Sequence, residues 1–387
     1  MRLTMRILFP PMASGLAALA VGALAQQAPP APPALATPGM TTPAAAPTGP
    51  YHVLKTVKVG GEGGFDYVYA DADGRKLYVA RGGPAPRVAV YNLDTLAPAG
   101  EIGQTGARGA ASDTQTHHGF ASSKPVAMWD TKTLAPVKTI AVDGNPDGIL
   151  NDAFNHHTYV FSHSAPNVTV LNDADGAILG IIDIGGAPEQ AAADGKGHVY
   201  VDIEDKDSVA VVDARTMKVT ATYPLNGKGG GNAGLALDVK NHVLFVACRD
   251  PQVMVMLDAD TGKYLADLPI GQGCDGAVFN PKTGECFSSQ GDGTLTVIKE
   301  RTPTTFVVEQ MVSTVPGAKT LTLDGKTGQV LLIAAQYGPP PAPPADAPAV
   351  AAPPAAAAPA PPPPPERRRG RRAPMVPGSF SILVVGK

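Results

Sequence analysis

Helical periodicity is missing from this chain, and cysteine, the residue of disulfide frameworks, is scarce. The 387 residues include three cysteines and one tryptophan, and aromatic side chains make up 5%. Apolar positions do not recur at the spacing of an amphipathic helix, which argues against a fold built on such helices. The formal net charge is −3, so overall charge gives little support for a nucleic-acid-binding protein.

Motifs that identify common enzymes are also missing. There is no Gly-x-Ser-x-Gly elbow, no Ser-x-x-Lys pair and no His-Glu-x-x-His metal motif. The Cys-x-x-Cys-His motif of c-type haem attachment is absent as well. The glycine-rich segment Lys228–Asn232 lacks the known phosphate-binding patterns. These absences favour a binding or scaffold protein over an enzyme, and they give no reason to expect an organic cofactor.

The N terminus has an apolar stretch that is too short for a membrane span. It runs from about Ala13 to Leu24 behind Arg2 and Arg6, whereas a spanning helix needs about 20 apolar residues. Ala23-Leu24-Ala25 offers a small-x-small cleavage site. We therefore predict a signal peptide over residues 1–25 and a mature chain, without a membrane span, in the periplasm or secreted. A retained anchor is the alternative.

Two tracts have a composition that cannot bury a core. Residues 26–50 are rich in Pro and Ala and predict an extended linker. Residues 338–377 form a Pro/Arg-rich tract inside the remaining domain, 51–387. This tract has no aromatic side chain on which bases could stack, so a solvated charged linker is the alternative to a patch for an anionic partner. The arginines of that patch are Arg367, Arg368, Arg369, Arg371 and Arg372.

What the chain does contain is a motif repeated seven times. An anchor residue is followed five positions later by Asp or Asn, and then, after six or seven more, by an aromatic residue or Leu. Successive anchors lie 42, 39, 42, 44, 42 and 44 residues apart, a period typical of propeller blades. The sequence therefore predicts an all-β, seven-bladed β-propeller with four-stranded antiparallel blades. The anchors are Asp66, Arg108, Asp147, Glu189, Ala233, Asp275 and Lys319.

The seventh blade is predicted to join the two ends of the chain. Its own strands, Thr320–Leu323, Val330–Ala335 and Ser379–Val385, leave a fourth place empty. The segment His52–Val59 precedes blade one and has strand character. We expect it to fill that place, because closing the ring removes exposed sheet edges.

Short phrases in the blades resemble a known family. Leu77-Tyr78-Val79-Ala80 and Val199-Tyr200-Val201-Asp202 look like degenerate YVTN repeats, although no copy keeps the Thr-Asn pair. The segments Gly185–Glu189, Val201–Asp205 and Gly291–Val297 are similar to exported YncE-like members. The resemblance implies a seven-bladed propeller in the cell envelope. Members of this broad group have been described as binding single-stranded DNA, and lactonases and quinoprotein subunits share related propellers.

The anchors are the main candidate site. Each precedes or begins the innermost strand of its blade, so the seven positions should converge at one mouth of the central channel, where polar groups could bind a ligand. The alternative is that they pair with one another and are structural. A divalent cation could bind carboxylates here, and Glu62, Asp66, Asp147 and Glu189 are its first candidates. The predicted ligand-binding residues are Asp66, Arg108, Asp147, Glu189, Asn232, Asp275 and Lys319.

Cysteines and histidines give weaker signals. Cys248 and Cys274 fall near the same end of the propeller and could form a disulfide, whereas three buried free cysteines are the alternative. The pairs His117-His118 and His156-His157 fall in turns at the opposite end and should be solvated. His163 lies nearer the anchors and remains a candidate.

We therefore expect a monomeric, exported protein that binds a small ligand or an envelope protein through the channel-mouth face. A lactonase-like hydrolase that uses the channel carboxylates is one alternative. Single-stranded DNA binding is the other, suggested by the family resemblance and the arginine cluster.

Overall fold

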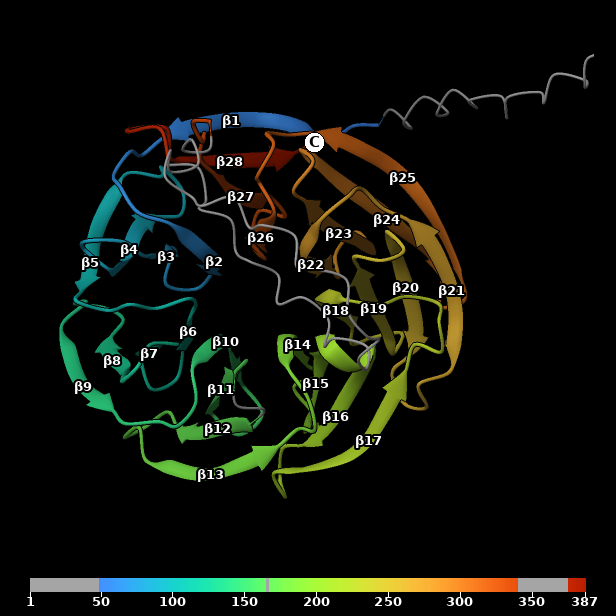
Figure 1. Cartoon of the computed structure of the whole chain (residues 1–387), viewed down its shortest axis with the longest axis horizontal. Helices are drawn as coiled ribbons and strands as arrows, with labels where there is room; N and C mark the ends of the chain where they lie inside the picture. The colour runs from blue at the N-terminus through green and yellow to red at the C-terminus, as the bar shows by residue number, and fades with distance from the viewer. Residues whose placement is uncertain (1–48, 165–166, 340–374) are drawn as a thin grey trace, which may run out of the picture. The chain divides into compact units, whose positions relative to one another are not determined.

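A computed structural model describes residues 49–164, 167–339 and 375–387. Seven antiparallel sheets of four strands each surround a central channel (Figure 1). The predicted signal peptide, almost all of the linker and the five arginines of the cluster lie outside the described residues. Across the described ranges, no helix has the length and apolarity needed to cross a membrane.

The first four blades follow one another along the chain. Blades one and two consist of β2 (Phe65–Asp71), β3 (Lys76–Arg81), β4 (Arg87–Asn92), β5 (Pro98–Gly103), β6 (Ala110–Asp113), β7 (His118–Ala121), β8 (Val126–Asp130) and β9 (Pro136–Ile140). Blades three and four consist of β10 (Pro146–Asp152), β11 (His157–Ser162), β12 (Asn167–Asn172), β13 (Ile178–Asp183), β14 (Pro188–Ala193), β15 (His198–Ile203), the 3₁₀ turn η1 (Glu204–Lys206), β16 (Ser208–Asp213) and β17 (Lys218–Pro224).

The last three blades complete the ring. Blades five and six consist of β18 (Asn232–Asp238), β19 (Val243–Cys248), β20 (Val253–Asp258), β21 (Tyr264–Pro269), β22 (Cys274–Asn280), β23 (Glu285–Gln290), β24 (Thr294–Thr302) and β25 (Thr305–Ser313). Blade seven combines both ends of the chain in β26 (Thr320–Leu323), β27 (Val330–Ala334), β28 (Ser381–Gly386) and β1 (His52–Lys58).

The predicted fold class is confirmed. In blades one to six the strands run in chain order from the channel outward, and the innermost strands of all blades contact one another in a closed ring: β2, β6, β10, β14, β18, β22 and β26. The predicted closure is also found, because β1 pairs antiparallel with β28 as the outermost strand of blade seven. Closure leaves each innermost strand between two neighbours, so all seven can present residues to one channel.

Recurring turn chemistry explains why the blades repeat. Between the third and fourth strands of blade two, the Asp130 carboxylate accepts hydrogen bonds from the backbone N–H groups of Lys132 (3.0 Å) and Thr133 (2.7 Å). Leu134 then takes a positive φ of 61°. Asp213 in blade four accepts the same bonds from Arg215 and Thr216. Such side-chain-to-backbone bonds fix a tight turn at each blade edge.

The core lies between blades rather than within them. Tyr78 of blade one packs on Trp129 of blade two, with ring centroids 5.6 Å apart, and both side chains are fully buried. Similar apolar clusters join each blade to the next around the ring. A blade therefore buries its apolar faces only when its neighbours are present.

Candidate functional site

The innermost strands carry irregularities at the anchor positions. The strand register shifts between Phe65 and Val68 in blade one, and between Pro146 and Ile149 in blade three. Corresponding shifts occur at the anchors of blades four, five and six. A β-bulge releases its extra residue from the ladder and re-aims the side chain. The bulges account for the Asp66, Asp147, Glu189 and Asp275 side chains at the channel mouth, whereas Arg108 and Lys319 lie just before their strands.

Six of the seven anchors, all but Ala233, line a cavity of about 410 Å³ at one end of the channel. Six of the seven residues predicted to bind a ligand are among its lining. The lining also contains His163, Glu204 and Arg249, so all seven blades contribute charged or titratable groups, and Phe65, Tyr67, Asn145 and Ser164 complete it. We call these nine residues the mouth cluster: Asp66, Arg108, Asp147, His163, Glu189, Glu204, Arg249, Asp275 and Lys319.

Charges of opposite sign alternate around the first half of the mouth cluster. Arg108 Nη1 lies 2.9 Å from Asp66 Oδ2, and its Nε lies 3.7 Å from Asp147 Oδ1. On the other side of Asp147, its Oδ2 lies 3.7 Å from His163 Nδ1. His163 Nε2 in turn lies 3.2 Å from Glu204 Oε2. The contact between Asp147 and His163 lies within blade three, and each of the others joins side chains from two neighbouring blades.

The alternation continues through the second half. Arg249 is paired with Glu204 through Nη1 and with Asp275 Oδ1 through Nη2, the latter at 2.7 Å. Lys319 is paired with the other oxygen of Asp275. Burial raises the pKa of Asp66, and the positive charge of Lys319 offsets part of that rise. These partners are side chains, so the ring can rearrange without breaking a strand.

Glu189 is the carboxylate that lacks a close cation in this ring. Its Oε2 accepts a hydrogen bond from the Tyr67 hydroxyl at 3.1 Å, and its nearest positive group, Arg249 Nη2, is 3.8 Å away. The side chain is only 14% exposed. Burial, together with the charges of Glu204 and Asp147, raises the pKa of Glu189 to about 7. This carboxyl group therefore gains and loses a proton near neutral pH.

Other carboxylates of the mouth cluster respond to the same crowding. Burial and the neighbouring charge of Asp147 raise the pKa of Asp66, and burial raises the pKa of Asp147. The hydrogen bond between His163 and Glu204 acts in the opposite direction on its two partners. It lowers the pKa of Glu204 and raises the pKa of His163. The cluster thus concentrates more negative charge than its cations neutralise.

Asn232 does not reach the cavity, which corrects its proposed place in the ring. It is fully buried and donates from Nδ2 to Asp202 Oδ1 (2.8 Å) and to the Ser208 carbonyl (3.0 Å). The bulged residue of blade five is the apolar anchor Ala233. Blade five contributes Arg249 instead, whose Nε donates to the Cys274 carbonyl at 3.1 Å.

Two of the added residues, Glu204 and Arg249, were missed by the sequence analysis, although the repeat contains a signal for them. Both lie four positions after the aromatic residue of the second strand, Tyr200 and Phe245, and His163 stands at the same distance from Tyr159. This position directly follows the second strand of the blade, in the connector to the third strand, which lies at the mouth end. At this register four of the seven copies carry a charged or titratable residue, Lys124, His163, Glu204 and Arg249, and the other three carry Gly or Ala, so the signal is confined to consecutive blades.

The cysteines are free. Cys248, Cys274 and Cys286 are all buried without a disulfide, so the bridge considered between Cys248 and Cys274 is not formed and the alternative of three buried thiols holds. Burial raises the pKa of Cys248 well above its usual range, which makes it a poor nucleophile.

The turn histidines at the opposite end are paired rather than simply solvated. His156 Nδ1 lies 2.9 Å from Asp113 Oδ1 of the preceding blade. His118 Nδ1 lies 2.7 Å from the Asp173 carbonyl of the following blade. These contacts link blades and give the turn histidines a structural role.

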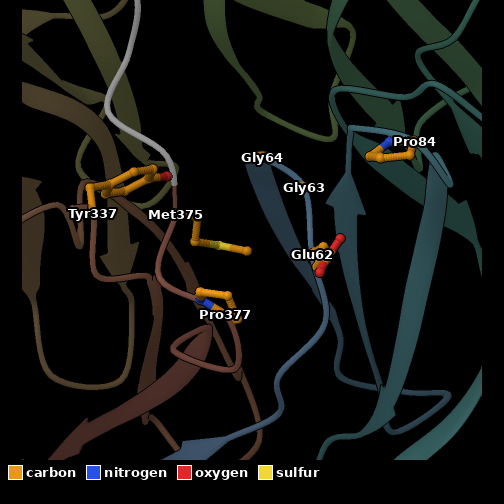
Figure 2. A pocket seen from close by; sticks show the side chains of 7 residues that line it. All are labelled: Glu62, Gly63, Gly64, Pro84, Tyr337, Met375 and Pro377. Atoms are coloured by element: carbon orange, nitrogen blue, oxygen red, sulfur yellow. The ribbon is translucent and has the colours of Figure 1, made fainter. Parts of the chain in front are cut away.

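Glu62 lies apart from the mouth cluster. It is exposed and lines a separate pocket of about 460 Å³, which Tyr337, Met375 and Pro377 also line (Figure 2). Within the described part of the chain, the group with metal-ligand geometry is a different one. Donor atoms of His163, Glu189 and Glu204 all lie within 4.8 Å of one another. A metal at the mouth would therefore use Glu189 of the predicted set, joined by two other residues.

Comparisons with known proteins define the fold class. No protein-family model matches the chain, and no curated protein matches it. A chain in the crystal structure of the mitotic checkpoint complex is similar, with a TM-score of 0.62 and 12% sequence identity. The match covers 77% of this chain and 93% of that one. At this identity the likeness shows the propeller fold alone.

Proposed function

We propose that this chain is an exported, YncE-like propeller that acts as a non-catalytic binding protein, and that its ligand enters the mouth cavity. The observation that carries the proposal is the convergence of ionisable side chains from all seven blades on one cavity. Its volume of about 410 Å³ falls in the range of about 300–1,000 Å³ that is typical of small-molecule sites. Export and the periplasmic location rest on the N-terminal sequence.

The charge of the mouth cluster narrows the class of ligand. With all five carboxylates ionised and His163 neutral, the cluster has an excess of two negative charges over its three permanent cations, and a proton on Glu189 or His163 lowers this excess. A ligand that brings positive charge relieves this excess, whereas a polyanion such as single-stranded DNA would be repelled. We therefore favour a small, polar ligand with a cationic group over a nucleic acid at this face.

The ion pairs within the mouth cluster leave room for a ligand. Asp66, Arg108 and Lys319 keep 28%, 43% and 44% of their side-chain surfaces exposed, and Glu189 has only a hydroxyl as a close partner. A cluster that served packing alone would fill its own interior, because protein cores leave few voids larger than a water molecule. Here a ligand-sized space remains open.

A lactonase-like hydrolase remains the second candidate, and one observation favours it. Glu189, with a pKa of about 7 and the Tyr67 hydroxyl at 3.1 Å, has the properties of a general acid or base. Turnover of a lactone panel that disappears in Glu189→Gln would support this candidate. Ligand binding without turnover would support the binding protein.

The experiment that tests the binding role is a thermal-shift and calorimetric screen of divalent metal ions, amines, zwitterions, polyols, lactones and oligonucleotides. Saturation at about 100 times Kd should add roughly 2.7 kcal/mol to stability, which is measurable as a higher Tm. Asp275→Asn removes the shared partner of Arg249 and Lys319 and should weaken a hit at least tenfold. Glu62→Gln, which changes a carboxylate outside the mouth cavity, is the matched control. A flat panel, or equal binding by both variants, would contradict the proposal.

A further inference from the structure

We propose that His163, Glu189 and Glu204 form a binding site for a divalent transition-metal ion, Zn²⁺ or Mn²⁺. The inference rests on the proposed function, since it identifies the positive charge that the mouth accepts. The sequence contains no loop motif that predicts such a site, because its ligands come from three separate segments of blades three and four.

The donor atoms are close to coordination geometry. Zn²⁺ bonds to histidine nitrogen and carboxylate oxygen at about 2.0–2.2 Å, so two donors on one ion lie at most about 4.4 Å apart. Donors of the three side chains lie within 4.8 Å of one another, and His163 Nε2 is 3.2 Å from Glu204 Oε2. Small side-chain rotations would bring all three onto a common ion.

The three ligands lie in or directly beside regular secondary structure. Glu189 lies in the bulge of β14, and Glu204 begins η1, where its N–H donates to the Ala187 carbonyl at 2.9 Å. His163 directly follows β11, whose last residue, Ser162, accepts from the N–H of Asn145 at 2.7 Å. Glu189 therefore lies on a strand, which holds a ligand more precisely than a loop does, and His163 and Glu204 directly follow strands β11 and β15.

An independent feature points to a metal-binding histidine. While His163 Nε2 faces Glu204, its Nδ1 lies 3.7 Å from Asp147 Oδ2. Histidines that bind metal through one ring nitrogen commonly direct the other toward a carboxylate, which fixes the ring orientation and raises its basicity. Asp147 is in place for that role, because it is buried and lies in the adjacent strand β10.

The surrounding charges are compatible with an added ion. The mouth cluster has an excess of two negative charges when Glu189 is ionised and His163 is neutral, and these are the protonation states in which both side chains can bind a divalent cation. Arg249 contacts Glu204 and would be repelled by the ion. It keeps Asp275 Oδ1 at 2.7 Å and the Cys274 carbonyl at 3.1 Å, so it can turn from Glu204 without losing all its partners.

The donor set favours some ions over others. Ca²⁺ takes six to eight oxygen ligands, and Mg²⁺ keeps an octahedral shell of oxygens. One imidazole with two carboxylates suits Zn²⁺ or Mn²⁺ better. Three protein ligands also leave coordination positions open toward the cavity, which is typical of metal sites that meet an exogenous ligand.

The test is calorimetric titration of ZnCl₂ and MnCl₂ into the untagged full-length chain after treatment with chelator. We expect one equivalent of Zn²⁺ or Mn²⁺ to bind, with CaCl₂ and MgCl₂ at least tenfold weaker. His163→Ala and Glu204→Gln should each weaken binding at least tenfold. The matched control is His242→Ala, because His242 pairs with Asp260 at 2.8 Å but has no third ligand beside it among the described residues.

Three outcomes would overturn the metal site. They are no bound equivalent, unchanged affinity in His163→Ala and Glu204→Gln, or an equal loss in the His242→Ala control. Melting curves of the metal-free variants show whether they fold, and His163→Gln replaces His163→Ala if the latter does not. Co²⁺ bound to the wild type should give visible ligand-field bands that His163→Gln lacks. If an amine binds and no metal does, this inference fails while the proposed function stands.

Discussion

The two ends of the innermost strands carry repeated acidic residues, yet they use them differently. At the end opposite the mouth, each Asp or Asn of the repeat accepts a hydrogen bond from a backbone N–H two or three residues further on. All seven copies do so, at 2.7–3.0 Å: Asp71, Asp113, Asp152, Asp194, Asp238, Asn280 and Asp324. These side chains are part of the turns that connect the first two strands.

At the mouth, the carboxylates have partners of another kind. Within the described ranges, no backbone N–H donates to the side chains of Asp66, Asp147, Glu189 or Asp275. Their contacts are with arginine, lysine, histidine and tyrosine side chains. Backbone partners tie a carboxylate to the fold, whereas side-chain partners can be exchanged for a ligand. Both sets of carboxylates are repeated around the ring. Whether a carboxylate is bonded to backbone or to other side chains therefore distinguishes the structural ring from the candidate site.

The largest effect on stability is expected from Asp324→Ala, which tests whether the carboxylates opposite the mouth are structural. Asp324 is 3% exposed and accepts two 2.8 Å bonds from Arg75 as well as bonds from Thr327 and the Lys326 N–H. Removing one partner of a buried, hydrogen-bonded ion pair costs about 3–5 kcal/mol. We expect a loss of that size in the free energy of urea unfolding. Asp73→Ala, which removes an exposed partner of Lys326, should change it by less than about 1 kcal/mol.

The same pair has a predictable pH dependence. Burial alone would raise the pKa of Asp324, but its bonds from Arg75 and Thr327 lower it to about 2. Because the folded-state pKa lies below the unfolded value, this stabilisation is present above about pH 4 and is lost as pH falls toward 2. The Asp324→Ala deficit should therefore shrink in acid, and a constant deficit from pH 6 to pH 3 would contradict the assignment.

Glu189→Gln tests the mouth cluster, and here the substitution is expected to increase stability rather than to lower it. The pKa of Glu189 is raised from 4.5 to about 7, so its contribution to stability is present below about pH 4.5 and is lost as pH rises through 7. A shift of this size corresponds to at most about 3 kcal/mol. In metal-free protein, the variant should gain stability over wild type at pH 8 and lose that gain at pH 4.5. Urea unfolding at pH 8 and at pH 4.5 measures the difference in stability between the variant and the wild type. A gain that does not depend on pH would show that ionisation of Glu189 is not its cause.

The sequence predicted the architecture well because the repeat encodes it locally. Turn residues, strand alternation and the unpaired segment before blade one were sufficient to predict seven blades and their closure. The mouth was predicted only in part, because the bulges that turn Asp66 and Asp147 toward the channel depend on strand register. Arg249 illustrates the limit. Its side chain crosses from blade five to Glu204 and Asp275, and such contacts between blades leave no pattern in one copy of the repeat.

Asn232 sharpens the comparison because it begins an innermost strand but belongs to neither ring. Its amide is the hydrogen-bond partner of the buried carboxyl group of Asp202. Asn232→Ala should lower the unfolding free energy by about 2 kcal/mol, the cost of leaving a buried polar group without its partner. Ligand binding at the mouth should not change by more than about twofold. A large loss of binding at unchanged stability would return Asn232 to the site.

The smallest effect on stability is expected from Asp66→Asn. Asp66 and Arg108 are partly exposed, at 28% and 43%, and Arg108 keeps Asp147 at 3.7 Å, so the pair should contribute less than about 1 kcal/mol. A cationic ligand should nevertheless lose about tenfold in affinity, or about 1.4 kcal/mol, because one carboxylate of the cavity is neutralised. Unfolding and calorimetry on the same variant measure both. If Asp66→Asn instead destabilises the protein as much as Asp324→Ala and leaves binding intact, the mouth is a second structural ring. The kind of partner would then not distinguish the two ends of the propeller.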